Sequence, residues 1–266
     1  MKLSFSTLGC PNWTWGEIIS VAKDLNYDGI ELRGLGEEIF LPNVNKFSDE
    51  NIAVTRSELS RNNIGISCIS TEVCLQNKED YKKLESYIEL AGKLGVPYIR
   101  VLGDAAPAPG SNVDGEAVFA ALKKHIPLAR EKNVVMLIET NGIYANSETL
   151  RGLIERLDSE QTGVLWDINH PVRFFNEEPG ETFENIGFAI RHVHLKDSVF
   201  ENGKISYKML GYGTLPIKPA LKLLKDAGYN GYLSLEWTKR WDKELEDAGI
   251  VFSHFAYMAR RLWNEA

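Results

Sequence analysis

The sequence predicts a single-domain (β/α)8 TIM barrel over residues 1–266, in the α/β class, on two observations. Short apolar segments rich in β-branched and aromatic residues alternate with segments that have the periodicity of amphipathic helices. Alternating strands and helices make a parallel sheet, because each crossover helix returns the chain to the same edge, and eight such units favour closure into a barrel. The alternative, an open doubly wound sheet, would ordinarily carry a glycine-rich phosphate loop after its first strand. Residues 7–12 read TLGCPN at that position, so the barrel is favoured.

Eight segments have the length and composition of buried strands, and glycine, asparagine or proline bounds them. They are Lys2–Thr7, Gly29–Leu32, Gly65–Ser70, Pro97–Leu102, Val134–Glu139, Gly163–Asp167, Ile190–Leu195 and Gly231–Glu236. Between the strands, the apolar residues recur at helical spacing. The predicted helices are Thr14–Leu25, Tyr81–Leu94, Glu116–Glu131, Ser147–Leu157, Ile217–Ala227 and Lys243–Trp263. We expect residues 177–180, which read EEPG, to form a loop over the barrel mouth.

The composition narrows the class of partner. The net charge of −7 disfavours binding to nucleic acid and to anionic membranes. Three cysteines without CxxC spacing argue against a disulfide framework and against a thiolate zinc site. No run of 18 apolar residues is present, and the first residues have the pattern of a strand rather than of a signal peptide. We therefore expect a cytoplasmic protein with a small-molecule substrate, and the sequence does not decide between a monomer and a homo-oligomer.

Ionisable residues end the last four predicted strands: Glu139, Asp167, His194 and Glu236. In a barrel these ends face one another across the C-terminal mouth, where the active sites of this fold lie. Any one glutamate at a strand end is more often a helix cap or an ion-pair partner. Three converging carboxylates, however, would repel one another unless a cation lay between them. The set therefore predicts one divalent ion held by oxygen and imidazole ligands, which suit Mn²⁺, Mg²⁺, Co²⁺ or Zn²⁺.

The alternation of side chains along a strand predicts which face each residue around His194 occupies. His192, His194 and Lys196 share one face, which places His192 a layer deeper and Lys196 nearer to the substrate if that face points inward. We expect His192 to be a core histidine with satisfied hydrogen bonds. Asp197 points to the other side by the same alternation, so it is expected to cap the next element and is given no catalytic role.

Further polar residues lie at or near strand ends. His170 follows Asp167 by three residues, at the predicted start of a loop, and is a further ligand, a donor to a substrate oxygen or a surface loop histidine. Arg33, Glu72 and Arg100 accompany earlier strands, and Arg100 is either a buried ion-pair partner or a residue of the mouth. Three tryptophans flank strand ends and could equally form walls against a substrate or fill the core; they are Trp13, Trp166 and Trp237. Substrate selectivity is expected in the loops after the first four strands.

Three strings resemble the motifs of a known family: WDINH at residues 166–170, HVHLKD at 192–197 and SLEW at 234–237. They are similar to the sugar phosphate isomerase/epimerase family, whose members are xylose-isomerase-like TIM barrels. The opening strand and the strings YDGIELR, LGVPYIRV and GYGTLPI fit the same family, so the resemblance covers nearly the whole chain. Together the strings are specific for the superfamily, although each alone is weak.

The resemblance implies a role for each residue that ends a late strand. Glu139 and Glu236 would bind the metal ion and also exchange protons with a substrate carbon. Asp167 and His194 would be metal ligands only. The fifth implied residue, His170, would contact the substrate.

The activity implied is that of a divalent-metal-dependent isomerase or epimerase, with Mn²⁺ as the most expected ion. It would act on a sugar, sugar phosphate, ketose or inosose by proton transfer through a metal-stabilised enediolate. Lys196, Arg100 and Glu72 complete the residues that we assign to binding of this carbohydrate or polyol.

Three alternatives remain. A metal-dependent lyase on the same scaffold, such as an inosose or dehydroshikimate dehydratase, would use the same enolate chemistry and then expel water. An apurinic endonuclease of the same superfamily would need more histidines than this chain offers and would have to bind DNA against the negative net charge. A non-catalytic ligand-binding barrel would have no need for all four metal-ligand candidates.

Overall fold

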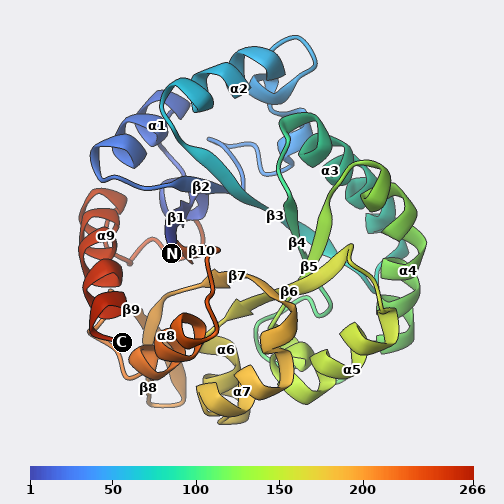
Figure 1. Cartoon of the computed structure of the whole chain (residues 1–266), viewed down its shortest axis with the longest axis vertical. Helices are drawn as coiled ribbons and strands as arrows, with labels where there is room; N and C mark the ends of the chain where they lie inside the picture. Colours follow the sequence, from blue (N-terminus) through green and yellow to red (C-terminus); the bar gives the residue numbers. More distant parts are fainter.

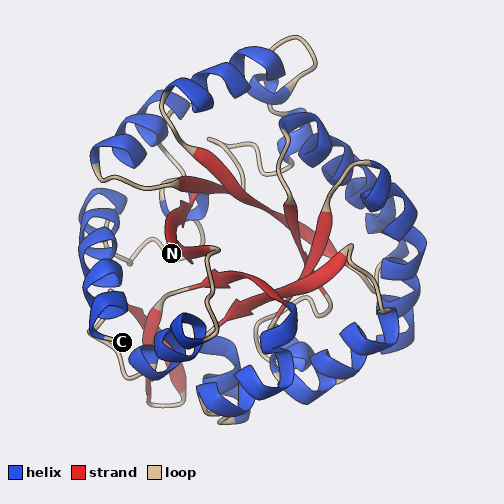
Figure 2. Ribbon diagram, in the orientation of Figure 1, coloured by secondary structure: helices blue, strands red, loops and turns tan.

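Eight parallel strands close into a barrel surrounded by helices in the computed structural model, which describes all 266 residues (Figure 1 and Figure 2). Going round the barrel, the strand order is β1-β10-β7-β6-β5-β4-β3-β2. The strands are β1 (Lys2–Ser6), β2 (Gly29–Leu32), β3 (Gly65–Cys74), β4 (Tyr98–Leu102), β5 (Val135–Glu139), β6 (Thr162–Asp167), β7 (Ile190–His194) and β10 (Tyr232–Leu235). Closure is made by β1 and β10, where Lys2 lies opposite Tyr232 and Phe5 lies opposite Leu235. The predicted fold and all eight predicted strands are confirmed.

Helices form the outer layer (Figure 2). The six predicted helices are present as α1 (Trp15–Asp24), α3 (Tyr81–Leu94), α4 (Gly115–Glu131), α5 (Ser147–Leu157), α8 (Ile217–Asp226) and α9 (Ala248–Glu265). Local chemistry sets their ends. The Thr14 side chain accepts a hydrogen bond from the backbone N–H of Glu17, whose carboxylate accepts from the backbone of Thr14 in return, so α1 begins with a capping box. At the C-terminal end of α3, the capping residue Gly95 adopts a positive φ of 72°, which glycine tolerates best.

Three helices were not predicted. They are α2 (Ile52–Arg61), α6 (Asn169–Phe175) and α7 (Pro179–Ile186). The expectation of a loop at residues 177–180 holds for Glu177 and Glu178 and is wrong for the other two, because Pro179 begins α7, which packs against α5 and α8 in the outer ring. Proline suits this position, since the first turn of a helix needs no backbone N–H donor and favours the φ angle that the ring fixes.

A two-stranded hairpin, β8 (Asp197–Glu201) and β9 (Lys204–Lys208), follows β7 and was also not predicted. Its turn is Asn202–Gly203, with φ angles of 52° and 76°, as a tight hairpin turn requires. The Asp197 carboxylate accepts hydrogen bonds from four backbone N–H groups, those of Ser198, Gly211, Gly213 and Leu215. Asp197 therefore organises the chain after β7, which agrees with the structural role expected for it.

The core is one apolar cluster of 64 buried residues that joins the strands to the helices. Inside the barrel the side chains are more polar and include Glu31, Ser70 and His192, all at most 1% exposed. No helix is both long enough and apolar enough to cross a membrane. The polar interior lies directly beneath the strand ends at which the predicted site residues gather.

Candidate metal centre at the barrel mouth

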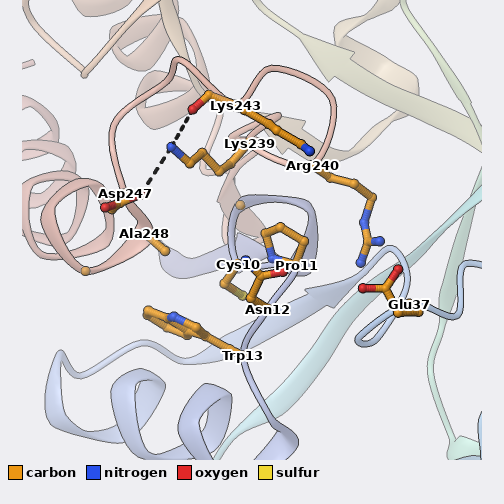
Figure 3. Close-up of a pocket in the computed structure, with 12 residues that line it drawn as sticks. Cys10, Pro11, Asn12, Trp13, Glu37, Lys239, Arg240, Lys243, Asp247 and Ala248 are labelled. Atoms are coloured by element: carbon orange, nitrogen blue, oxygen red, sulfur yellow. Dashed lines mark hydrogen bonds and ion pairs between the residues drawn. The ribbon is translucent and has the colours of Figure 1, made fainter.

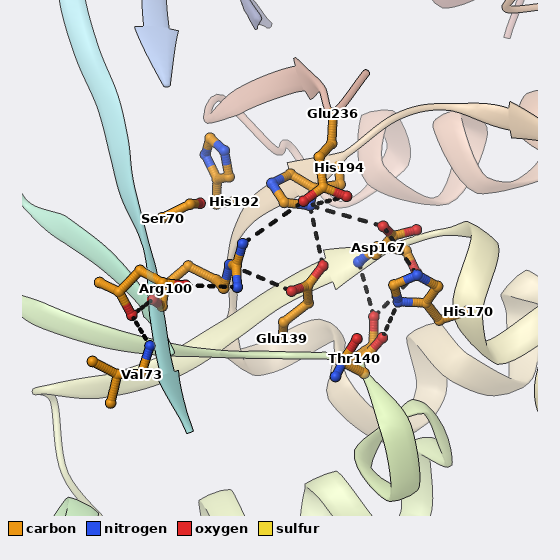
Figure 4. Close-up of polar contacts among 12 residues, drawn as sticks. Ser70, Val73, Arg100, Glu139, Thr140, Asp167, His170, His192, His194 and Glu236 are labelled. Atoms are coloured by element: carbon orange, nitrogen blue, oxygen red, sulfur yellow. Dashed lines mark hydrogen bonds and ion pairs between the residues drawn. The ribbon is translucent and has the colours of Figure 1, made fainter. Parts of the chain in front are cut away.

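Four side chains from four strands converge at the carboxyl ends of the strands (Figure 4). Glu139, Asp167 and His194 are the last residues of β5, β6 and β7, and Glu236 directly follows β10. The register places Asp167 opposite His194, so neighbouring parallel strands end at the same level. Exposure ranges from 0% for Asp167 and His194 to 7% for Glu236. One ligand atom from each side chain lies within 4.8 Å of the others.

The four side chains fit a divalent ion. Two atoms bound at about 2.1 Å to one ion can lie at most about 4.2 Å apart, so shifts of a few tenths of an ångström would bring all four into range. Oδ2 of Asp167 is buried and has no hydrogen bond, and it forms an ion pair with Nζ of Lys196 at 2.6 Å. An acceptor left in this state is one that a metal ion would satisfy. Three carboxylates and one imidazole could therefore hold a divalent metal ion.

Glu31, the third residue of β2, has a side chain inside the barrel and orients His194. Nε2 of His194 lies 3.0 Å from Oε1 and 3.1 Å from Oε2 of Glu31. Nδ1 of the same ring faces the other carboxylates, at 3.2 Å from Oε1 of Glu139. With the Nε2 proton donated to Glu31, the lone pair of Nδ1 is directed at the metal site, the arrangement that a carboxylate behind a ligating histidine produces. The sequence analysis missed Glu31, whose signal was a carboxylate inside the buried segment GIEL.

Glu31, His192 and His194 form a second group with metal-ligand chemistry. In this group, however, Nε2 of His192 lies 2.8 Å from Oε2 of Glu31, a hydrogen-bond distance. Both oxygens of Glu31 are already paired with the two imidazoles, whereas Oδ2 of Asp167 in the group of four has no hydrogen bond, so the metal ion is assigned to the group of four. His192 is buried as predicted, but its Nδ1 has no partner, so only half of its expected hydrogen bonding is present.

The surrounding charges keep Glu139 and Asp167 ionised despite their burial. Burial raises the pKa of Glu139, but Arg100 and His194 outweigh it and hold the pKa at about 2. Burial likewise opposes ionisation of Asp167, whose pKa His170, Lys196 and His194 lower. The pKa of His194 moves the other way: burial lowers it, but Glu31 and Glu236 raise it well above its ordinary value. A proton and a metal ion would therefore compete for this imidazole.

Two buried cations face the same carboxylates. Nζ of Lys196 lies 2.5 Å from Oε2 of Glu236, and Nε of Arg100 lies 3.4 Å from Oε2 of Glu139. Arg100 also reaches Glu236, at 3.8 Å from Nη2 to Oε1, and donates from Nη1 to the carbonyl of Thr71 at 3.0 Å. Arg100 is thus both a buried ion-pair partner and a residue of the mouth, the two placements that the sequence left open.

His170 lies in the first turn of α6, not in the loop expected from the sequence. Oδ1 of Asp167 accepts a hydrogen bond from the backbone N–H of Asn169, the first residue of this helix, at 2.8 Å. Nδ1 of His170 is 2.8 Å from the carbonyl of Thr140, to which it donates, and Nε2 is buried without a hydrogen bond, 3.7 Å from Oδ2 of Asp167 (Figure 4). His170 lies outside the group of four ligand atoms and lines the cavity above them.

That cavity has a volume of about 340 Å³ and opens over the metal-ligand candidates. All the residues that the sequence analysis assigned to catalysis or substrate binding line it, namely Glu72, Arg100, Glu139, His170, Lys196 and Glu236. Two of the tryptophans weighed as substrate walls, Trp166 and Trp237, are instead 1% exposed in the core. The aromatic walls are Tyr207 on the hairpin and Trp241 after β10, neither of which was predicted.

A larger hollow of about 600 Å³ lies beside this cavity, between the loops after β1 and β10 (Figure 3). It contains none of the metal-ligand candidates. Lys239 lines this hollow, and its ammonium group lies 2.9 Å from the carbonyl of Lys243 and 3.1 Å from a carboxylate oxygen of Asp247. Because the metal-ligand candidates do not reach this hollow, the candidate site is the smaller cavity.

Comparison with known proteins supports this reading of the fold. The model of the Xylose isomerase-like TIM barrel family matches residues 19–254. An uncharacterized protein of Methanocaldococcus jannaschii is 24% identical over 90% of this chain and 90% of its own length. A second uncharacterized protein of that organism is 28% identical, and the match covers 49% of this chain but only 44% of that protein.

Solved structures are similar over nearly the whole chain. The zinc-bound IOLI protein has a TM-score of 0.82 at 16% identity, covering 100% of this chain and 99% of its own. L-ribulose 3-epimerase has a TM-score of 0.80 at 15% identity, covering 99% and 95%. The probable 3-DHS dehydratase AsbF from Bacillus anthracis has a TM-score of 0.78 at 18% identity, covering 98% and 99%. At these identities the likeness concerns the fold.

Proposed function

Because the chain belongs to the Xylose isomerase-like TIM barrel family, we propose that it is a divalent-metal-dependent isomerase or epimerase of a small carbonyl-bearing carbohydrate or polyol. The metal ligands would be Glu139, Asp167, His194 and Glu236, with Mn²⁺ as the expected ion. Held there, the ion would supply a Lewis acid for the carbonyl and a neighbouring hydroxyl of the substrate. An epimerase and a probable dehydratase among the proteins of similar fold agree with this class of chemistry.

One observation carries the proposal: two glutamates reach one cavity from different sides of the barrel. Glu139 ends β5 and Glu236 follows β10, and strands β6 and β7 lie between them in the barrel order. A substrate in the cavity would therefore have one carboxylate near each side of its reacting carbon. Proton removal by one glutamate and return by the other inverts that carbon, whereas return to the adjacent carbon gives an isomerase.

Three further side chains would assist proton transfer. The free Nε2 of His170 is available to accept a hydrogen bond from a substrate hydroxyl, because its Nδ1 proton is donated to Thr140. The cations of Lys196 and Arg100 offset the negative charge that develops on the substrate oxygens as the enediolate forms. Both cations are at most 5% exposed, where electrostatic stabilisation is stronger than in water.

A dehydratase is the second candidate, and Lys196 is the observation that favours it. Its buried ammonium lies 2.5 Å from Glu236, so a proton donor stands beside a proposed base. Loss of a hydroxyl from the β-carbon needs such a donor at the leaving oxygen. A dehydratase releases water and forms a product with a new carbon–carbon double bond, which an epimerase never does.

The test is solvent exchange at the substrate carbon. Protein loaded with Mn²⁺ and desalted is incubated in deuterium oxide with a panel of ketoses, inososes and dehydroshikimate, and mass spectrometry follows deuterium uptake and water loss. We expect uptake of one deuterium without water loss for at least one ketose or inosose, and no uptake after removal of the ion with a chelator. Water loss would assign the dehydratase instead. Exchange unaffected by the chelator would contradict the metal-dependent mechanism.

A further inference from the structure

Arg33 is a buried cation whose side chain makes no hydrogen bond. It directly follows β2, is 8% exposed, and lines the same cavity as Arg100 and Lys196. Its Nη1 is buried without a hydrogen-bond partner, and the nearest carboxylate oxygen, Oε2 of Glu72, lies 3.7 Å away. A guanidinium presents five N–H donors, and burying them unsatisfied costs free energy. A ligand that fills the cavity with an anionic group would remove this cost.

The other two cations of the cavity differ from Arg33 in this respect. Lys196 contacts carboxylates at 2.5 Å and 2.6 Å. Nε of Arg100 also has no hydrogen bond, but its Nη1 donates to a carbonyl at 3.0 Å and two carboxylates lie within 3.8 Å of its guanidinium. The single carboxylate near Arg33 is shared, because Oε2 of Glu72 already accepts a hydrogen bond from the Tyr87 hydroxyl at 2.7 Å. Arg33 is therefore the cation of the cavity that is left for a ligand.

The backbone around Arg33 is held in place. The backbone N–H of Arg33 donates to Oγ1 of Thr7 at 2.8 Å, and the Thr7 hydroxyl donates to the carbonyl of Gly34 at 2.7 Å. Thr7 is 1% exposed. One buried threonine thus fixes the chain on both sides of Arg33, so the guanidinium projects from a rigid strand end, as a binding residue should.

We propose that Arg33 binds a carboxylate of the substrate, which makes the substrate an acidic keto sugar or keto polyol. This assignment rests on the proposed function. The planar guanidinium matches the two oxygens of a carboxylate, and such paired hydrogen bonds fix orientation as well as affinity. Arg33 would hold the acid group while the carbonyl end lies over Glu139 and Glu236, which line the same cavity.

The test compares ligands that differ at one carbon. D-Fructuronate, D-fructose and D-fructose 6-phosphate carry a carboxylate, a hydroxymethyl group and a phosphate ester at the same position, and D-tagaturonate with D-tagatose repeats the first comparison. Affinities are measured by calorimetry on Mn²⁺-loaded protein. We expect at least one acid to bind at least about 10-fold more tightly than its neutral partner, because hydrogen bonds to charged groups are the stronger ones. Equal affinity, or no binding of either acid, would overturn the assignment. A preference for the phosphate ester would also overturn it and would show that Arg33 binds a phosphate group of the substrate.

Variants locate the effect at Arg33. Arg33→Gln should abolish the preference for the acid, Arg33→Lys should retain part of it, and Glu72→Gln should increase it by removing the competing carboxylate. A purely structural role for Arg33 predicts no gain in Glu72→Gln, so a failure to gain argues against the proposal even if Arg33→Gln folds poorly. Mn²⁺ affinity serves as the control and should be unchanged in Arg33→Gln. Deuterium exchange without a preference for the acid would contradict only the role of Arg33. Acid binding without deuterium exchange would contradict the proposed function.

Discussion

Nε2 of His194 lies 3.0 Å from Oε1 of Glu31, a carboxylate from a strand far from β7 in sequence. This contact leaves Nδ1 facing Glu139, Asp167 and Glu236, at 3.2 to 3.8 Å from their nearest oxygens. Glu31 thereby selects which nitrogen of the ring is available to a metal ion.

We expect Glu31→Gln to weaken Mn²⁺ binding by about 10- to 100-fold, the usual cost of losing a carboxylate behind a ligating histidine. The amide keeps the size of the side chain but removes the negative charge that makes the imidazole a better ligand. Calorimetric titration with Mn²⁺ measures the effect, and the absorption spectrum of bound Co²⁺ reports whether the ligand geometry changes. Wild-type affinity in this variant would show that Glu31 acts only in packing.

Glu139→Gln and Glu236→Gln should each lower turnover by at least about 10²-fold at saturating Mn²⁺, since general acid–base catalysis contributes about 10²–10⁴-fold. Each amide retains an oxygen for the ion but cannot accept the substrate proton. Glu155→Gln is the matched control, because Glu155 is exposed on α5 and pairs with Arg151 at 2.7 Å. If either site variant, fully loaded with metal, stays within about tenfold of wild type, the two-glutamate mechanism fails.

The two histidines should separate metal binding from substrate binding. His194→Ala removes a candidate ligand and is expected to lose most of the bound ion. His170→Ala removes a ring outside the group of four and should retain the ion while losing turnover or substrate affinity. Elemental analysis after loading and desalting measures both. Equal metal loss in the two variants would make His170 a ligand.

Metal affinity should increase with pH. The pKa of Glu139 is about 2 and that of Asp167 is also lowered, so these carboxylates are ionised throughout the neutral range. The pKa of His194 is raised, so the metal-free ring binds a proton that the ion must displace. Mn²⁺ titrations from about pH 6 to about pH 9 should show affinity rising by up to about tenfold per pH unit until the ring loses its proton unaided. A flat profile would mean that His194 is already neutral or does not ligate.

The sequence by itself determined the barrel and the four residues at its late strand ends. Each strand candidate could be recognised locally, and parallel strands around a barrel end at one edge, so Glu139, Asp167, His194 and Glu236 had to meet. The helix α7 was missed for a local reason: its eight residues are too few for a clear periodicity, and Pro179–Gly180 resembles a turn.

Only the tertiary structure decided which polar groups satisfy one another. Glu31 reaches His194 because closure of the barrel brings β2 across from β7, with a register shift between Ile30 and Glu31 where β2 pairs with β3. The side chain of Arg33 makes no hydrogen bond, and the nearest carboxylate, that of Glu72, accepts one from Tyr87. Strand periodicity fixes which face a side chain occupies but not its distance from a side chain on another strand. That distance depends on register and closure, which many weak contacts along the whole chain set together.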